Sequence, residues 1–297
     1  MKLGFIGLGK MGSKMVLSLL QKNFEVIVYA RKTEAMKEVA EKGAIPSDSY
    51  EDFCNKLPEP KIIFLMVTHG KPVDEVISSL LPFLKKGDII VDCGNSFYED
   101  SIRRANSLQK KGIIFMDVGT SGGLKGALNG ASLMIGGDKK TFYYLEPIFK
   151  ALAVKDGYAY LGNNGSGHFA KMVHNGIEYC FLQALGEGYQ LLKKSDFNYD
   201  LRKVTLVYKN GSVIRSWLID LLYEAICEDQ ELSSFEGKIG GGETGIWTLK
   251  TARKYKVKMP SLKVALSERK KSMKNQSYAS KVVSALRQKF GGHEEPK

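Results

Sequence analysis

The chain has 297 residues, of which 43% are hydrophobic and 10% aromatic, a composition that is typical of a globular protein and excludes a disordered or collagen-like chain. Its longest uninterrupted apolar run, residues 62–67, is too short to span a bilayer. The net charge of +12 is concentrated in residues 249–274, which carry ten Lys or Arg residues against the single acid Glu268. Such a basic block can attract nucleic acid, a membrane surface or a small anion, or it can simply be a solvated helix face.

The start of the chain and its cysteines favour a cytoplasmic protein. Lys2 leads directly into a strand-and-turn pattern, without the apolar segment of a secretory signal. The four cysteines, Cys54, Cys93, Cys180 and Cys227, lie far apart and form no C-x-x-C pair. This usage is typical of reduced thiols in a cytosolic protein. We therefore expect no membrane partner.

The first half of the chain alternates between two periodicities. Short apolar runs that end in Gly or a polar turn occupy residues 2–6, 25–30, 61–67, 88–92 and 112–118. Stretches of 15–25 residues with helical spacing lie between them. This alternation predicts an α/β Rossmann-type domain, a parallel sheet covered by helices on both faces, over residues 1–163.

The character of the sequence changes after the turn-rich segment 162–167. Residues 168–193 have the length and apolar spacing of one long helix, and further helical patterns follow at about 199–230, 246–257, 261–272 and 276–289. No convincing alternating strand appears in this part. We expect an all-α domain over residues 164–297.

The first turn has the spacing G-x-G-x-x-G, formed by Gly7, Leu8, Gly9, Lys10, Met11 and Gly12. The spacing alone is weak, but here it follows a predicted strand and opens a predicted helix. Glycines in that context let backbone N–H groups approach a pyrophosphate at the positive end of the helix. The turn therefore predicts dinucleotide binding, the alternative being a tight turn that binds nothing.

The end of the second predicted strand discriminates between cofactors. NAD enzymes usually place Asp or Glu there to bind the ribose 2′-hydroxyl, whereas this chain has Arg31 and Lys32. A guanidinium can bind a 2′-phosphate through two hydrogen bonds. We expect NADP rather than NAD, unless these cations merely begin a solvated helix.

The first helix of the second domain carries a polar face. Lys171, His174, Asn175 and Glu178 stand at i, i+3, i+4 and i+7, a spacing that normally carries a buried apolar stripe. Polar groups on such a face are costly unless they line a polar cavity. A desolvated lysine can accept a proton from an alcohol, and a glutamate two turns further can supply one. The alternative is a solvent-facing pairing of Lys and Glu.

A second glycine-rich segment, Ser121-Gly122-Gly123, ends the α/β half. Its successive N–H groups and hydroxyl suit a carboxylate or phosphate, although it can also be only a turn. The order of Ser121 and His174 could suggest a hydrolase, but no G-x-S-x-G elbow is present. The histidines form no metal-binding motif, so we expect no metal.

These motifs together resemble 6-phosphogluconate dehydrogenase (decarboxylating), in the short form with one helical domain. The resemblance extends from Gly4 to His293, and the runs from Lys171 to Tyr179 and from Phe290 to His293 are its most specific parts. The matching segments are residues 7–12, 65–67, 88–96, 121–123, 167–179, 213–217, 245–248 and 290–293. The resemblance implies oxidative decarboxylation of 6-phosphogluconate to ribulose 5-phosphate in the pentose phosphate pathway, with reduction of NADP.

The resemblance also implies catalytic roles. Lys171 would be the base that takes the proton of the 3-hydroxyl and would then assist loss of CO₂. Glu178 would protonate C1 of the resulting enediol. His174 and Asn175 would orient the substrate.

Binding roles follow from the same resemblance. Met66 and Val67 would contact the nicotinamide, Asn95 would lie between cofactor and substrate, and Ser121, Gly122 and Gly123 would hold the substrate carboxylate.

At the other end of the substrate, Tyr179 and Arg215 would meet the phosphate. Arg287 and His293 would reach the site from a neighbouring subunit, so a homodimer, alone or in a dimer of dimers, would be the smallest active unit.

Two departures concern the phosphate. Larger members of the family have a lysine where this chain has Gly242, and short members tend to have an arginine where it has Ile246. A third departure, Thr68-His69-Gly70 in place of small residues, affects the expected nicotinamide contacts.

Two alternative functions remain. Another β-hydroxyacid dehydrogenase, of the 3-hydroxyisobutyrate or tartronate semialdehyde type, would share the glycine turn and Lys171 but generally lacks His174 and Glu178. A silent dinucleotide-binding module could instead hold nucleic acid through the basic block, but no recognition motif accompanies the block, so we expect no nucleic acid partner.

Overall fold

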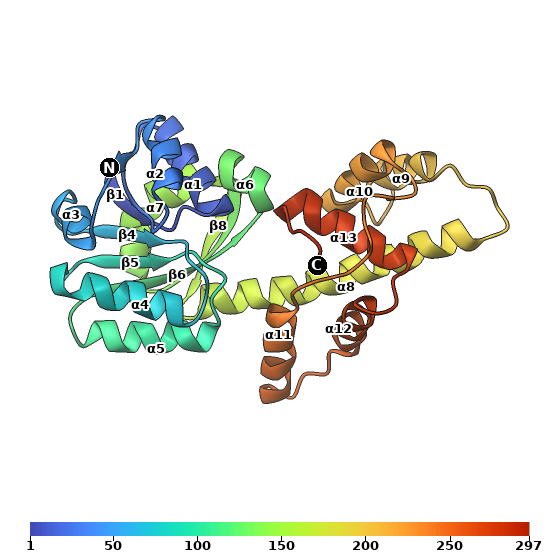
Figure 1. Ribbon diagram of the computed structural model, residues 1–297. Helices are drawn as coiled ribbons and strands as arrows, with labels where there is room; N and C mark the ends of the chain where they lie inside the picture. Colours follow the sequence, from blue (N-terminus) through green and yellow to red (C-terminus); the bar gives the residue numbers. More distant parts are fainter. Residues whose placement is uncertain (297) are drawn as a thin grey trace. The chain divides into compact units, whose positions relative to one another are not determined.

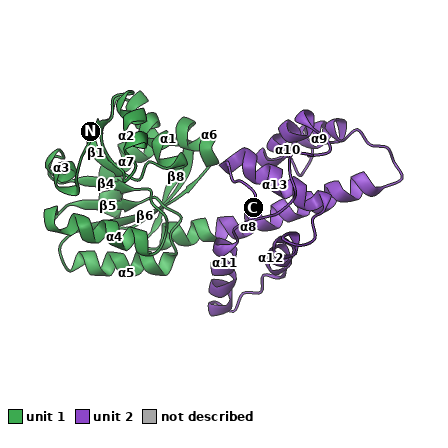
Figure 2. Ribbon diagram, in the orientation of Figure 1, with its two compact units in different colours: residues 1–172 green, residues 173–297 purple. Residues whose placement is uncertain are grey.

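The structure is a computed structural model that describes residues 1–296. It divides into two compact units, residues 1–172 and the residues from 173 onward (Figure 2). The sequence predicted a boundary between 163 and 164. The structural division falls later because the first turns of helix α8 (Ser166–Lys194) pack on the sheet of the first unit.

The first unit is built on an eight-stranded sheet with the order β3-β2-β1-β4-β5-β6-β7-β8 (Figure 1). The strands are β1 (Lys2–Ile6), β2 (Glu25–Tyr29), β3 (Ile45–Pro46), β4 (Ile62–Leu65), β5 (Ile89–Asp92), β6 (Ile114–Ser121), β7 (Ala131–Gly136) and β8 (Ala153–Gly162). Every neighbouring pair is parallel except β6 and β7, which are antiparallel. The five predicted strands are all present, whereas β3, β7 and β8 were not predicted.

Helices cover both faces of this sheet. They are α1 (Lys10–Gln21), α2 (Thr33–Ala40), α3 (Tyr50–Asn55), α4 (Lys71–Leu80), the 3₁₀ helix η1 (Leu81–Phe83), α5 (Tyr98–Gln109), α6 (Gly123–Asn129) and α7 (Lys139–Leu152). Successive strand residues belong to different cores: Phe5 and Phe64 pack in the cluster with α1 and α7, while Ile6 and Ile63 pack in the cluster with α3, α4 and α5. Burial on both faces explains why these strands are continuously apolar in sequence.

The second unit is helical, as predicted, and every strand among residues 1–296 ends by Gly162. After α8 it contains α9 (Leu201–Lys209), α10 (Trp217–Glu228), α11 (Glu243–Lys254), α12 (Pro260–Ser272) and α13 (Tyr278–Gly291). The pattern at 199–230 is two helices rather than one, because Ser216 caps α10 by accepting the N–H of Ile219. Within the described part of the chain, no helix has the length and apolarity needed to cross a membrane.

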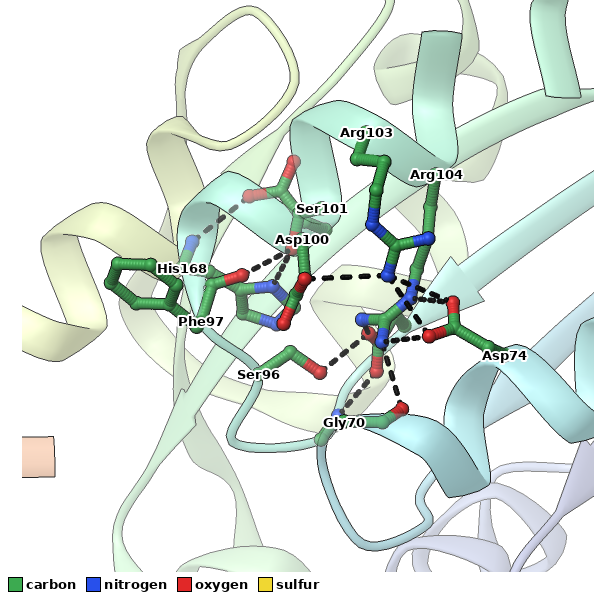
Figure 3. Close-up of polar contacts among 12 residues, drawn as sticks. Gly70, Asp74, Ser96, Phe97, Asp100, Ser101, Arg103, Arg104 and His168 are labelled. Carbon is green, nitrogen blue, oxygen red and sulfur yellow. Dashed lines mark hydrogen bonds and ion pairs between the residues drawn. The ribbon is translucent and has the colours of Figure 1, made fainter. Parts of the chain in front are cut away.

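A buried charge network joins the two loops that follow β4 and β5 (Figure 3). Arg104 of α5, with a side chain only 2% exposed, donates from Nε to Asp74 Oδ1 at 2.8 Å and from Nη2 to the carbonyl of Gly70 at 2.9 Å. Its Nη1 lies 3.6 Å from Oδ2 of Asp92. Burial raises the pKa of Asp74, but hydrogen bonds from Arg104 and Arg103 outweigh burial and hold that pKa below its usual range.

Asp92 then fixes the loop after β5. One carboxylate oxygen accepts the N–H of Gly94 at 3.0 Å and the other accepts the hydroxyl of Ser96 at 2.7 Å. A Cβ on Gly94 would lie 2.9 Å from the carbonyl oxygen of Val67. The loops that carry Val67 and Asn95 are therefore held against each other by one guanidinium and one carboxylate.

Replacing Arg104 by Leu should lower the free energy of unfolding by about 3–5 kcal/mol, because Asp92 would lose its cation while remaining buried. Arg103→Leu is the matched control, since Arg103 also binds Asp74 but its side chain is 56% exposed, and it should cost about 1 kcal/mol or less. Urea denaturation of both variants measures the difference. An equal decrease in the free energy of unfolding in both variants would show that the buried contacts of Arg104 stabilise the protein no more than the exposed contacts of Arg103.

Candidate active site

In the glycine turn after β1, two glycines have no room for a side chain and the third faces open space. Gly7 adopts φ +99°, and a Cβ there would overlap the carbonyl oxygen of Met66. A Cβ on Gly12 would overlap the carbonyl oxygen of Gly7. Gly9, which precedes the first residue of α1, has no atom within 4 Å of a built Cβ, so space is open in front of this helix N-terminus. These features fit a dinucleotide cradle, since the open backbone N–H groups can approach a pyrophosphate.

Arg31 and Lys32 lie just beyond β2 and are both exposed. Lys32 is the N-cap residue of α2 and makes no side-chain capping bond. Arg31 is close enough to Tyr50 to oppose the rise that burial causes in the pKa of that phenol. Two cations therefore stand at the carboxyl end of β2, where the ribose of a dinucleotide is bound in this fold.

The other residues expected on the cofactor side lie at the same sheet edge. Met66 and Val67 follow β4, and the N–H of Met66 donates to the carbonyl of Ile6 at 2.8 Å. Asn95 is exposed in the loop after β5. Ser121 ends β6, and Gly122, with φ +120°, caps the helix α6 that begins at Gly123. The carboxyl ends of parallel strands form the usual ligand edge of such a sheet.

Lys171 is seated against β6. A Cβ on Gly119 would overlap Cβ of Lys171 and would lie 2.9 Å from the carbonyl oxygen of Gly167. The start of α8 therefore approaches the strand so closely that only glycine fits between them.

The predicted polar face exists on an unbroken helix. Lys171, His174, Asn175 and Glu178 are all half-buried residues of α8. Nδ1 of His174 lies 3.0 Å from Oδ1 of Asn175 and 3.9 Å from Oε2 of Glu178. The four side chains are therefore partly shielded from solvent.

In the second unit, two guanidinium groups gather beside Tyr179. The guanidinium carbon of Arg269 lies 4.0 Å from the Tyr179 ring centroid, and Nη1 donates to the carbonyl of Gly240 at 3.3 Å. A Cβ on Gly241 would lie 3.5 Å from Nη2 of Arg287 and 3.9 Å from Nη1 of Arg269. Backbone at Gly241 thus lies against both cations.

These cations are held at an electrostatic cost. Burial and the neighbouring charge of Arg269 lower the pKa of Arg287 to about 10. Burial also lowers the pKa of Arg269, although Tyr179 and Glu178 oppose that change. Two desolvated guanidiniums side by side favour an anion between them.

The structure places one further arginine beside the residues expected near the phosphate. Arg215 lies in the exposed loop between α9 and α10, whereas Arg269, which sequence reasoning missed, lies over Tyr179. Arg287 lies beside Arg269 within the chain, and its expected role on a neighbouring subunit stays a prediction. His293 packs its ring against Phe290 near the end of α13. The only sequence signal for Arg269 was its place in the basic block.

The basic block lines a cavity of about 740 Å³ between α11 and α12. All charged residues on its wall, among residues 1–296, are cations: Lys250, Arg253, Lys263, Arg269 and Lys270. The segment 240–242 forms one side, and Ile246 adds apolar surface. The block is therefore not only a solvated helix face, because part of it lines an open hollow whose charged residues are cations.

Residues 1–296 contain no group of three or more His, Cys, Asp or Glu side chains that could hold a metal ion.

Comparison with known proteins gives a family match for each of the two parts of the chain. Residues 2–162 match the NAD binding domain of 6-phosphogluconate dehydrogenase, and residues 167–295 match the 6-phosphogluconate dehydrogenase C-terminal domain. The Bacillus subtilis 6-phosphogluconate dehydrogenase homologue YqeC is 42% identical, over 99% of this chain and 98% of its own. The NAD⁺-dependent, decarboxylating 6-phosphogluconate dehydrogenase of Haloferax volcanii is 41% identical, over 99% of this chain and 98% of its own.

Solved structures support the same grouping. The 6-phosphogluconate dehydrogenase of Plasmodium falciparum, studied with NADP⁺ and with 6-phosphogluconate, superposes with a TM-score of 0.84 at 32% identity, covering 92% of this chain and 62% of that one. The 3-hydroxyisobutyrate dehydrogenase of Mycobacterium tuberculosis, with a TM-score of 0.76 at 19% identity, covers 96% of this chain and 99% of its own and shares the fold. On the two domain matches and the full-length relatives, this chain belongs to the 6-phosphogluconate dehydrogenase family.

Proposed function

We propose that the protein oxidises and decarboxylates 6-phosphogluconate to ribulose 5-phosphate and CO₂, with NADP as the preferred acceptor. The observation that carries this proposal is the polar face of α8. It presents a lysine and a glutamate two helical turns apart, with His174 and Asn175 between them. An alcohol oxidation followed by decarboxylation needs both a base and an acid.

The residues at the sheet edge fit a dinucleotide, because Gly7 and Gly12 leave no room for side chains and Gly9 faces open space. Bound NADP would accept a hydride from C3 of the substrate. Arg31 and Lys32 would hold its 2′-phosphate, and backbone of the glycine turn would hold its pyrophosphate. The proposal for NADP rests on these two cations, since the relatives include NAD⁺-dependent enzymes.

Proton transfers follow from the polar face. Lys171, as the neutral amine, takes the 3-hydroxyl proton while C3 becomes a carbonyl. The substrate carboxylate is then β to that carbonyl, so CO₂ leaves and the bond electrons form an enediol. Lys171 returns its proton to the C3 oxygen, which completes the enediol. The Glu178 carboxyl then protonates the carbon that lost CO₂, which becomes C1 of ribulose 5-phosphate, while Lys171 takes back the proton of the neighbouring hydroxyl so that this oxygen becomes the ketone. His174 and Asn175 hold the substrate hydroxyls, while Ser121, Gly122 and Gly123 hold the carboxylate.

The phosphate of the substrate would be held by Arg269, Arg287 and Tyr179. Arg269 is buried and Arg287 is half-buried, and both lie against the glycine segment 240–242, so a dianion would relieve their repulsion. This arrangement supplies positive charge although Gly242 stands in the place of the family lysine. Arg215 has no role in this proposal.

A homodimer, alone or in a dimer of dimers, and a cytoplasmic location complete the proposal by family resemblance. The alternative, a β-hydroxyacid dehydrogenase of the 3-hydroxyisobutyrate or tartronate semialdehyde type without decarboxylation, shares the fold. It would not need the acid Glu178.

A steady-state assay with 6-phosphogluconate tests the reaction. We expect NADPH and CO₂ to form in equal amounts, and kcat/KM to be higher with NADP than with NAD. Lys171→Ala should lower turnover far more than about tenfold, the equivalent of 1.4 kcal/mol in the barrier. Reduction of the cofactor without release of CO₂ would favour the alternative dehydrogenase.

The cofactor cradle is tested by Gly9→Ala. Gly9 has an extended backbone and open space around it, so alanine should leave the melting temperature unchanged. Its methyl group would nevertheless obstruct the pyrophosphate and raise the Kd for NADP about tenfold or more, or 1.4 kcal/mol. Fluorescence titration measures the Kd. An unchanged Kd would mean that the turn binds no dinucleotide.

Cofactor choice is tested by Arg31→Ser. Loss of charge-assisted hydrogen bonds worth about 1.5–3 kcal/mol should lower kcat/KM for NADP by about tenfold to a hundredfold and leave NAD unaffected. Lys37→Ser, an exposed cation one turn further along α2, is the control and should change neither value. A wild-type preference for NAD would refute the assignment.

The phosphate site is tested by Arg287→Met. Arg287 is the half-buried member of the two adjacent cations. Removing it should leave the ligand-free protein as stable or more stable, since its pKa of about 10 reflects desolvation and the neighbouring charge of Arg269. The KM for 6-phosphogluconate should nevertheless rise about a hundredfold, or 2.7 kcal/mol. Arg215→Met is the control. An increase in KM for Arg215→Met alone would restore the original assignment.

A further inference from the structure

Asp117 is a fully buried carboxylate near the end of β6. Its Oδ1 accepts the N–H of Gly165 at 2.7 Å, and its Oδ2 accepts the N–H of His168 at 2.9 Å. These are N–H groups of the first turn of α8 and of the residue before it, which have no partner within the helix. A negative charge at this end of a helix is also favourable to its dipole. One side chain of the sheet therefore caps the helix that carries Lys171.

The same face of β6 also seats Lys171. Residues 117 and 119 point to one side of the strand, because side chains alternate along it. At 117 the strand supplies the cap, and at 119 it supplies a glycine against which Cβ of Lys171 packs. Residues 117 and 119 of one strand thus fix both the start of α8 and the Cβ atom of Lys171.

Two further glycines let the helix come this close. A Cβ on Gly136 of β7 would lie 2.8 Å from Oδ1 of Asp117, and a Cβ on Gly167 would overlap backbone of β6 and β7. The helix start is therefore packed on strand backbone. Such contact leaves little freedom for α8 to slide.

A second attachment comes from His168, whose side chain is 1% exposed. Its Nδ1 lies 2.7 Å from Oγ of Ser101 in α5 (Figure 3). Within residues 1–296, its buried Nε2 has no hydrogen-bond partner. A buried ring nitrogen without a partner is unfavourable for stability. His168 lies three residues before Lys171, and its attachment to Ser101 further fixes the position of this turn.

We propose that Asp117 is a positioning residue for Lys171, acting through the first turn of α8 rather than on the substrate. This inference rests on the proposed function only for its kinetic consequence, because the geometry holds in the protein alone. A lysine displaced by about 1 Å from its reacting hydroxyl can cost a hundredfold in rate.

Asp88 offers a matched control in the same unit. It is buried, and its carboxylate accepts the N–H groups of Lys61 at 2.7 Å and Lys85 at 2.8 Å. It precedes β5 and so lies at the sheet edge opposite the carboxyl ends of the strands. Asp88→Asn therefore disturbs a buried carboxylate that accepts two backbone N–H groups, and its 3.5 Å ion pair with Lys61, without disturbing α8.

The experiment compares Asp117→Asn, Gly119→Ala and Asp88→Asn at equal concentrations of cofactor-binding sites. Asp117→Asn and Gly119→Ala should each lower kcat about a hundredfold, leave the Kd for NADP within twofold, and shift the acidic limb of the pH profile of kcat/KM. Asp88→Asn should keep kcat within threefold of wild type and should keep the wild-type pH profile. We expect this even if its melting temperature falls as far as that of Asp117→Asn. A loss of kcat in Asp117→Asn no larger than in Asp88→Asn would overturn the proposal.

Gly119→Ala keeps the test decisive where Asp117→Asn does not fold, since it leaves the carboxylate in place and pushes on Lys171 and on the backbone at Gly167. Wild-type kcat in that folded variant would refute the seating of Lys171 on β6. Labelling of lysines with acetic anhydride, followed by mass spectrometry, tests the position of Lys171 independently of the proposed reaction. Asp117→Asn should raise the labelling rate of Lys171 relative to Lys71, whose side chain is 87% exposed, even if 6-phosphogluconate is not the substrate. Unchanged labelling would count against the proposal.

Discussion

The bond between a buried carboxylate on β6 and the first turn of α8 is the constraint on which the rest of the structure depends. Asp117 places a charge inside the sheet unit, and the N–H groups of Gly165 and His168 are what make that burial tolerable. Lys171 lies in the second turn of α8, so it takes its position from this start. The glycines at 119 and 167 are consequences of the same close approach.

Buried charge is used in two opposite ways. Arg104 lies among the carboxylates of Asp74 and Asp92 and the carbonyl of Gly70, so its contacts hold two cofactor-side loops together. Arg287 lies beside another cation, and its pKa is lowered by burial and by Arg269. The first arrangement stabilises the protein alone. The second is costly in the protein alone and becomes favourable only when an anion is bound.

The structure shows where much of the positive charge of the chain lies. Residues 249–274 include Arg269, which is buried over Tyr179, and cations that line the cavity between α11 and α12. One part of the basic block therefore belongs to the candidate phosphate site. The remainder keeps a general attraction for anions, which suits an enzyme with two phosphorylated ligands.

The sequence by itself determined what depends on local spacing. The glycine turn after β1 and the face of Lys171, His174, Asn175 and Glu178 were predictable because the periods of strand and helix place neighbours in the chain together. Only the tertiary structure decided the partners that are distant in sequence. Arg269 is 90 positions from Tyr179, and Asp117 is about 50 from the turn that it caps, so packing of separate elements brings them together. Strands β7 and β8 escaped prediction for the same reason, because their pairing, rather than their own sequence pattern, makes them strands.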